Sequence, residues 1–240
     1  MRAVLFDLDG TLLDIDIDAF LRVYFAALGP VIAELTGSSP AEAIDAVMAS
    51  TNAMVRAHPG QTNREVFNTC FLGLTGVDLA QRDGVIDEFY SCTFPTLGAG
   101  LRPRAGARRA VEAALSNGLL VAVATNPIFP AAAINERIRW AGVADLPFSF
   151  VSTYENMHSC KPDPGYYLEI ASVLNVAPTD CLMVGDDHVL DMRAAHVGMA
   201  TFFVGDGAGG SADHVGDFDD LSELLPRLAS RPLEQRDHAL

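Results

Sequence analysis

Two aspartates stand close together directly after the first apolar segment of the chain. Asp7 and Asp9 follow residues 3–6 and precede Gly10-Thr11. A buried carboxylate is costly unless a cation or hydrogen-bond donors accompany it, so the pair could bind a metal ion or carry out catalysis. Asp-Gly is also a common start of a turn. By itself the pair does not distinguish a catalytic site from a turn.

Further polar groups follow later apolar segments. Thr125 and Asn126 come after the run 119–124. Their hydroxyl and amide could hold phosphate oxygens, although a helix cap or a turn would use the same residue types. The segment 185–191, Gly-Asp-Asp-His-Val-Leu-Asp, places three carboxylates after the run 181–184. A solvated acidic loop is the ordinary alternative for that cluster.

The chain contains a single lysine, Lys161, in the segment Cys160-Lys161-Pro162, and all the other basic residues are arginine. A general preference for arginine, with one lysine in a solvated loop, would explain this without any function. Because the compact ammonium of lysine and the planar guanidinium of arginine are not equivalent, a requirement for lysine at this point is the alternative. Composition does not separate the two interpretations.

Short apolar runs bounded by polar residues or glycine predict buried parallel strands. Helical patterns at 105–117 and 164–175 lie between them, which favours an α/β fold with a doubly wound parallel sheet. In such sheets ligands bind beyond the carboxyl ends of the strands, where the polar groups described above stand. The runs are 3–6, 119–124, 148–151, 181–184 and 200–204.

Residues 16–97 carry helical periodicity and no convincing strand. Apolar residues at helical spacing begin at Phe20, and Pro30 is expected to kink or divide this first helix. Capping boxes at Ser39 and Thr62 predict the starts of two further helices. The predicted organisation is an α/β core of residues 1–15 and 98–229, an inserted all-helical segment of residues 16–97, and a polar tail of residues 230–240.

The composition restricts the classes of partner. A formal charge of −15 disfavours nucleic acids and anionic membranes, which need a basic face. The apolar runs are shorter than the roughly 20 residues that cross a bilayer. The N-terminal segment leaves no room for a signal peptide, so a cytoplasmic protein is expected. The cysteines form no C-x-x-C pair and are expected to be reduced thiols. They are Cys70, Cys92, Cys160 and Cys181.

Together these groups supply what phosphoryl transfer requires: a nucleophile, a proton donor, a phosphate-binding hydroxyl, a cation and metal-binding carboxylates. Their order and spacing resemble the haloacid dehalogenase (HAD) superfamily, and the resemblance spans roughly residues 3–205. The matching motifs are Asp-x-Asp-Gly-Thr at 7–11, Thr125, Lys161-Pro162, and Gly-Asp-x-x-x-x-Asp at 185–191.

The resemblance implies a Rossmann-like phosphatase that hydrolyses a small phosphorylated metabolite through an aspartyl-phosphate intermediate. Asp7 would be the nucleophile. Asp9 would protonate the leaving oxygen and then deprotonate the attacking water. Thr125 and Asn126, with backbone amides after Asp7, would hold the phosphoryl oxygens, and Lys161 would neutralise charge beside Asp7.

The resemblance also implies a magnesium ion. Mg²⁺ would lie between the carboxylate of Asp7, the backbone carbonyl of Asp9 and the carboxylate of Asp186, with waters completing its octahedron. Asp191 would orient a bound water rather than bind the ion directly, and Asp187 could do either.

In the resembling family, a helical segment in this position is a cap of the C1 type, a lid that excludes water and selects the substrate. The most polar loop of this segment, residues 56–64, could contact an anionic leaving group, although a solvent-facing loop is the more ordinary interpretation. The sequence identifies neither the substrate nor the oligomeric state.

Other classes of protein fit the sequence less well. A phosphomutase would keep Asp7 and Asp9 and stays open, because retention of the phosphoryl group depends on closure of the lid. A dehalogenase would lack Asp9. A signalling receiver domain has its phosphorylated aspartate on a middle strand and no large helical insertion. A non-catalytic binding protein is disfavoured because every motif position is intact.

Three other signatures are absent or out of context. The segment 205–210, Gly-x-Gly-x-x-Gly, matches the dinucleotide fingerprint, but no helix clearly begins there. The six histidines lack the spacing of zinc ligands. The Gly-Lys-Ser/Thr sequence of a nucleotide kinase does not occur.

Overall fold

A computed structural model describes residues 1–56, 60–206 and 210–229 of the chain. Its main feature is a six-stranded sheet in the order β5-β4-β1-β6-β7-β8, in which every pair of neighbours is parallel. The predicted doubly wound parallel sheet is therefore confirmed. The strands are β1 (Ala3–Phe6), β4 (Leu120–Val123), β5 (Phe150–Val151), β6 (Cys181–Gly185), β7 (Ala200–Val204) and β8 (His214–Gly216).

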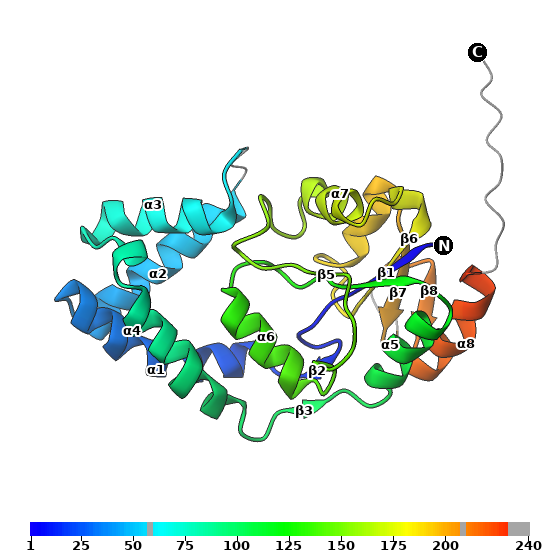
Figure 1. The fold of residues 1–240 in the computed structure, drawn as a ribbon, viewed down its shortest axis with the longest axis horizontal. Coiled ribbons are helices and arrows are strands. Elements are labelled where there is room, and N and C mark those ends of the chain that lie inside the picture. Colours follow the sequence, from blue (N-terminus) through cyan, green and yellow to red (C-terminus); the bar gives the residue numbers. More distant parts are fainter. Residues whose placement is uncertain (57–59, 207–209, 230–240) are drawn as a thin grey trace, which may run out of the picture.

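The alternation of side chains along the strands creates two hydrophobic cores, one on each face of the sheet. Val4 and Phe6 of β1 contribute to one cluster, together with the buried faces of α5 (Ala107–Ser116), α6 (Ala131–Trp140) and α8 (Phe218–Ala229). Ala3 and Leu5 contribute to the other cluster, against α7 (Pro164–Val173). Figure 1 shows α7 on the opposite side of the sheet from α5 and α8.

The central position of β1 brings the motifs to one edge of the sheet. Phe6, the last residue of β1, is paired with Val123 on one side and with Val184 on the other. The residues that follow these three strands therefore leave the sheet next to one another. The expected juxtaposition of the loops after 6, 124 and 185 follows from this register.

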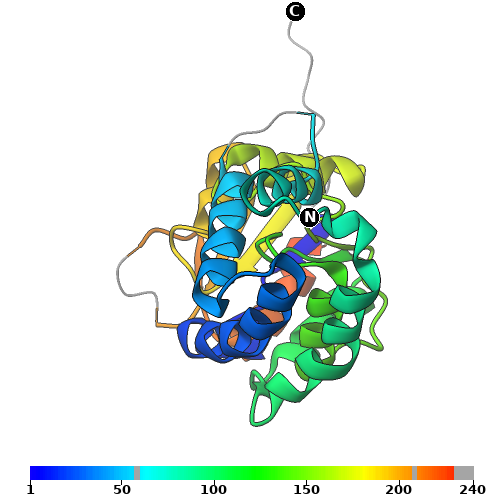
Figure 2. The ribbon, with the colours of Figure 1, turned by 90° about the vertical axis from the view of Figure 1, so that its left-hand side faces the viewer.

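Among the described residues, four helices and three short helical turns occupy the chain between β2 (Leu13–Asp14) and β3 (Arg102–Pro103), two short strands that pair with each other. Figures 1 and 2 show these helices gathered on one side of the molecule, beyond α6. The helices are α1 (Ile17–Thr36), α2 (Pro40–Val55), α3 (Asn63–Thr75) and α4 (Asp83–Glu88). A 3-10 turn (Leu79–Gln81) precedes α4, and a π-helical turn (Phe89–Thr93) and a second 3-10 turn (Phe94–Gly98) follow it.

The capping boxes at Ser39 and Thr62 are both formed, with Glu42 and Glu65 as the reciprocal partners. Of the two expected effects of Pro30, a kink or a division, the division does not occur, because α1 runs as one helix past Pro30. The proline follows Gly29, which packs against Pro40 and Ile44 of α2. Packing against α2 outweighs the hydrogen bond that the proline cannot donate.

The remaining differences concern short or terminal elements. The predicted strand at 148–151 contains only two residues in strand geometry, and β8 was not predicted. By length and composition α1 could cross a membrane, as many core helices of water-soluble proteins could; here its buried side chains include Phe20, Tyr24 and Leu28. The predicted tail at 230–240 and Gly207 of the Gly-x-Gly-x-x-Gly segment lie outside the described residues.

Candidate active site

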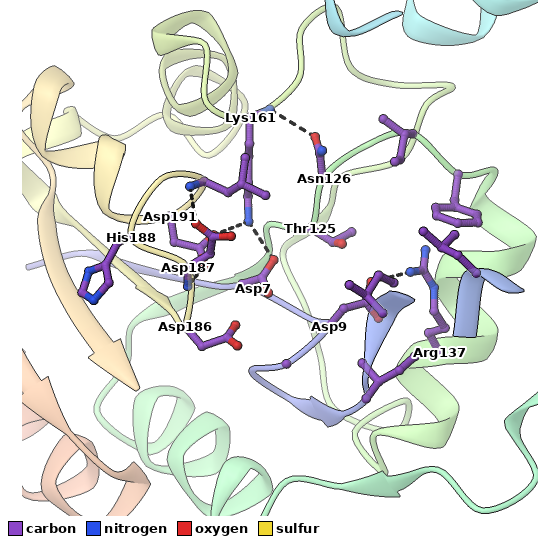
Figure 3. Close-up of a pocket in the computed structure, with 17 residues that line it drawn as sticks. Asp7, Asp9, Thr125, Asn126, Arg137, Lys161, Asp186, Asp187, His188 and Asp191 are labelled. Carbon is purple, nitrogen blue, oxygen red and sulfur yellow. Dashed lines mark hydrogen bonds and ion pairs between the residues drawn. The ribbon is translucent and has the colours of Figure 1, made fainter. Parts of the chain in front are cut away.

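A cavity of about 460 Å³ opens at the carboxyl ends of β1, β4 and β6. Figure 3 shows the polar side chains that line it, coming from the loops after these strands, from the segment before α7 and from α6. All eight candidate site residues named from the sequence are among them. The polar lining consists of Asp7, Asp9, Thr125, Asn126, Arg137, Lys161, Asp186, Asp187, His188 and Asp191.

Lys161 joins two carboxylates at the base of the cavity. Its Nζ donates to Oδ1 of Asp7 at 2.7 Å and to Oδ1 of Asp191 at 2.6 Å, and all three side chains are almost completely buried. Burial alone would lower the pKa of Lys161, but the carboxylates of Asp191 and Asp7 raise it well above its usual value. Lys161 is therefore a permanent cation beside Asp7. Its burial excludes the alternative interpretation of Lys161 as a lysine in a solvated loop.

Asp191 holds Lys161 and the loop after β6 in place. Its Oδ1 accepts from Lys161, and its Oδ2 accepts from the backbone N–H of Asp187 at 3.1 Å. Gly185 makes room for it, because a Cβ at that position would collide with the Asp191 carboxylate. Both oxygens of Asp191 thus have protein donors, and its expected role in orienting a bound water stays a prediction.

Asp187 and Asp186 are adjacent in the chain but differ in their contacts. Asp187 is exposed, and its Oδ1 accepts from the backbone N–H groups of Val189 and Leu190, so it shapes the loop. Asp186 points toward the loop after β1, where its Oδ1 accepts from the Thr11 hydroxyl at 2.8 Å. Burial raises the pKa of Asp186, and the Thr11 hydrogen bond opposes this shift.

The acidic groups at the strand ends fit a hard divalent cation. Carboxylate oxygens of Asp7, Asp186 and Asp191 all lie within 4.8 Å of one another. Gly10 has a φ of 80°, and a Cβ there would collide with the Asp186 carboxylate. The glycine thus permits the close approach of Asp186 to the loop after β1. An all-oxygen donor set of this kind suits Mg²⁺.

Asp9 is turned away from Asp7 and forms an ion pair with Arg137 of α6 (Figure 3). The arginine is completely buried, and its guanidinium lies over the ring of Phe129, 4.3 Å from the ring centroid. Burial raises the pKa of Asp9, while Arg137 opposes this shift. Oδ1 of Asp9 and both Nε and Nη2 of Arg137 are buried without a hydrogen-bond partner, so the pair retains unused polar atoms at the cavity.

Arg137 was not predicted, although the sequence contains a signal for it. The buried face of α6 comprises Ala133, Ile134, Arg137 and Ile138. A charged residue on an otherwise apolar helical face needs a buried partner of opposite charge. That partner, Asp9, is 128 residues away along the chain, and helical periodicity does not identify it.

Thr125 and Asn126 both line the cavity but have different neighbours. The Thr125 side chain is buried, and its backbone carbonyl accepts from the hydroxyls of Ser152 and Tyr166. Oδ1 of Asn126 accepts from the backbone N–H of Lys161 at 3.1 Å. Asn126 therefore also positions the segment that carries the lysine.

The polar loop 56–64 is described only in part, because residues 57–59 lie outside the described residues. Its end docks on the core: the side chain of Asn63 is buried and donates to the carbonyl of Pro127 at 3.0 Å. The backbone N–H of Asn63 also donates to the carbonyl of Met157 at 2.8 Å. None of the described residues of this loop lines the cavity.

Comparison with known proteins assigns the family. The sequence model of the haloacid dehalogenase-like hydrolases matches residues 1–198. A phosphoglycolate phosphatase from Xylella fastidiosa is 30% identical over 197 residues, which cover 81% of this chain and 75% of that protein. The chain therefore belongs to the haloacid dehalogenase-like hydrolases and is a hydrolase, as the motifs predicted.

Solved structures support the same fold. A HAD phosphatase from Thermococcus onnurineus superposes with a TM-score of 0.58 at 21% identity, covering 94% of this chain and 98% of that one. An L-2-haloacid dehalogenase superposes with a TM-score of 0.54 at 22% identity, covering 94% and 99%. Since proteins named for different reactions share this fold, the reaction has to be inferred from the side chains.

Proposed function

We propose that this protein is a magnesium-dependent phosphatase that hydrolyses a small phosphomonoester through an aspartyl phosphate on Asp7. The observation that carries the proposal is the buried contact of Asp7 with Lys161, in a cavity that also contains Asp9. A dehalogenase would not have the second carboxyl of the motif. The similarity to phosphoglycolate phosphatases supports phosphorus chemistry.

In the first step a carboxylate oxygen of Asp7 attacks phosphorus, and the bond between phosphorus and the leaving oxygen breaks. Asp9 donates its proton to that oxygen, so the alcohol departs neutral. In the second step Asp9 accepts a proton from water as the water oxygen attacks phosphorus, and the bond to Asp7 breaks. Inorganic phosphate is released, and both aspartates return to their starting states.

The protonation behaviour of Asp9 suits this exchange. Burial raises its pKa, which brings a carboxyl group closer to the range in which it can serve as both acid and base. In the structure Oδ2 of Asp9 contacts Arg137. To reach the leaving group, Asp9 either rotates away from the arginine or uses Oδ1, which has no hydrogen-bond partner among the described residues, while Oδ2 stays with the arginine. Arg137 thus acts through Asp9 as a positioning residue.

The other polar groups stabilise the negative charge on the reacting atoms. Lys161 stabilises the negative charge beside Asp7, and the hydroxyl of Thr125 with the amides after Asp7 would hold the phosphoryl oxygens. Mg²⁺ would be held by the carboxylates of Asp7 and Asp186 and by the carbonyl of Asp9. When bound, it would offset the charge on the phosphoryl oxygens.

We further propose that residues 16–97 act as the cap of this enzyme, between core segments 1–15 and 98–229. The two pairing strands β2 and β3 are the places where the chain leaves and re-enters the core. The protein would work in the cytoplasm, without nucleic-acid or membrane partners. Its four cysteines are all free thiols, in keeping with a reducing compartment.

The test is a screen of phosphorylated metabolites with and without Mg²⁺, combined with rapid quenching in acid. The proposal predicts magnesium-dependent release of phosphate and a transient phosphoprotein whose label is lost in hydroxylamine, as expected of an acyl phosphate. Transfer of the label to a second substrate molecule, with no release of phosphate to water, would identify a phosphomutase instead. Absence of both the phosphoprotein and turnover across the panel would refute the proposal.

A further inference from the structure

A second cavity, of about 290 Å³, lies within the helical segment and is referred to below as the apolar chamber. Its walls come from α1, α2, α3 and α4, from the helical turns on either side of α4, and from the loops that follow β4 and β5. Aromatic and aliphatic side chains form most of its surface. Tyr24, Leu28, Val47, Phe67, Phe71 and Tyr90 are among them.

The described lining of the chamber contains no group that could neutralise a charged ligand. Among the described residues that line it, none carries a charged side chain. The hydroxyls of Tyr24 and Tyr90 lie 2.8 Å apart and bond to each other, so neither depends on a ligand for a partner. A carboxylate or second phosphate placed here would lose its hydration without gaining a cation.

The chamber adjoins the catalytic cavity. Leu21, Ile128 and Phe129 line both cavities. Phe129 stacks against Arg137, the partner of Asp9. A group attached to the leaving oxygen that Asp9 protonates would therefore extend past Phe129 directly into the apolar chamber.

The rim of the chamber exposes apolar side chains to solvent. Met48 and Val55, both on α2 and both lining the chamber, are 42% and 48% exposed. Covering such side chains with an apolar ligand removes their surface, and that of the ligand, from water. A ligand with an extended apolar group would gain this contribution, and a small acid would not.

We propose that the substrate is a phosphomonoester of an extended apolar alcohol, whose alkyl or aryl group occupies the apolar chamber while its phosphate meets Asp7. This inference rests on the proposed function for its phosphate end, and on the chamber for the rest of the molecule. The inference narrows the substrate class from any small phosphorylated metabolite to phosphomonoesters whose leaving group is uncharged and apolar.

A homologous series of n-alkyl phosphates, from methyl to octyl, tests the inference. Each ester is used below the concentration at which the longer esters form micelles. The value of kcat/KM with Mg²⁺ should rise by up to about fourfold for each methylene that enters the chamber. Octyl phosphate should then exceed methyl phosphate by roughly 100-fold or more.

Val55→Asp and Val23→Asp form a matched pair of variants. Val23 lies on α1, is 52% exposed and lines neither cavity, whereas Val55 lines the chamber. Val55→Asp should reduce the octyl-to-methyl ratio at least about tenfold, because a hydrated carboxylate at the rim disfavours the alkyl chain. Val23→Asp should keep the wild-type ratio. A flat series, or equal ratios in the two variants, would overturn the inference while leaving the proposed function intact.

Binding of n-alkylphosphonates, measured by calorimetry with Mg²⁺, tests the chamber without turnover. The dissociation constant should fall with chain length in the wild type and in Val23→Asp, and much less in Val55→Asp. If this pattern appears while no phosphate ester is hydrolysed, the chamber inference holds and the proposed function fails. If octylphosphonate binds no more tightly than methylphosphonate, the chamber is only a void of the fold and the inference is refuted.

Discussion

Arg137 donates from Nη1 to Oδ2 of Asp9, so that a completely buried guanidinium on α6 holds the second carboxyl of the Asp-x-Asp motif. The ion pair turns Asp9 away from Asp7, the group beside which the proposed mechanism requires it. Burial raises the pKa of Asp9 and the cation opposes that shift. Arg137 therefore controls both where Asp9 points and how readily it holds a proton.

Replacing Arg137 with methionine should raise the pKa of Asp9 further, because the charge that favours its ionised form is lost while burial remains. The limb of the pH profile of kcat/KM that reports Asp9 should move to higher pH. Arg137→Lys, which keeps a cation but not the planar group over Phe129, should show a smaller displacement.

The measurement for Arg137 is the pH dependence of phosphate release from one ester at saturating Mg²⁺, with unfolding by urea followed in parallel. A variant that is less stable but retains the wild-type pH profile would show that Arg137 only supports the fold. In that case its role in positioning Asp9 would be refuted.

The parallel sheet and the position of most site residues could be predicted from the sequence. Near-continuous apolar strands dictate a sheet covered on both faces, and parallel strands carry the groups that follow them to a common edge. Asp7, Thr125 and Asp186 meet for this reason, although they are far apart in the chain. Lys161 could be placed near them only through its motif, since it follows a two-residue strand.

The parts that could not be predicted depend on contacts between distant side chains. Arg137 pairs with Asp9, and Asn63 docks on the loop after β4. Neither contact is indicated by the periodicity of apolar residues in the sequence. The same holds for Asn126, whose amide oxygen accepts from the backbone of Lys161. The continuity of α1 past Pro30 likewise depends on its packing against α2, which local propensity does not include.

Asp7→Asn should abolish turnover and the phosphoprotein, because a carboxamide oxygen cannot form the acyl phosphate. Asp14→Asn, an equally conservative change at an exposed position on β2, should retain wild-type activity. Phosphate release and acid-quenched labelling are measured for both. An Asp7→Asn protein that turns over at the wild-type rate would show that another group is the nucleophile.

Asp186→Asn and Asp187→Asn separate metal binding from loop structure. Asp186 belongs to the acidic cluster, so its loss should raise the Mg²⁺ concentration for half-maximal activity by at least the 10- to 100-fold typical of a lost outer-shell partner. In Asp187→Asn the side-chain oxygen can still accept from the backbone N–H groups of Val189 and Leu190. The Mg²⁺ titration of this variant should therefore stay near wild type. Identical Mg²⁺ titrations of the two variants would argue against Asp186 as a ligand.

Lys161→Met should destabilise the fold as well as abolish activity. The lysine side chain is 1% exposed and is shared by Asp7 and Asp191, which are 11% and 1% exposed. Removing the cation leaves two buried carboxylates without a counter-charge, at a cost of roughly 3–5 kcal/mol in the free energy of unfolding. Urea unfolding at constant pH measures this loss.

The loss of stability in Lys161→Met should depend on pH. Burial raises the pKa of Asp191 to about 7 in the presence of the lysine, and removal of the cation should raise it further. A carboxyl group whose pKa is higher in the folded state than in the unfolded chain loses stability as pH rises. The deficit relative to wild type should therefore be larger at pH 8 than at pH 5.

Adding Asp191→Asn to Lys161→Met removes one of the two uncompensated charges and should recover part of the lost stability at pH 8. A double variant no more stable than Lys161→Met at that pH would contradict the assignment of the buried charge to Asp191.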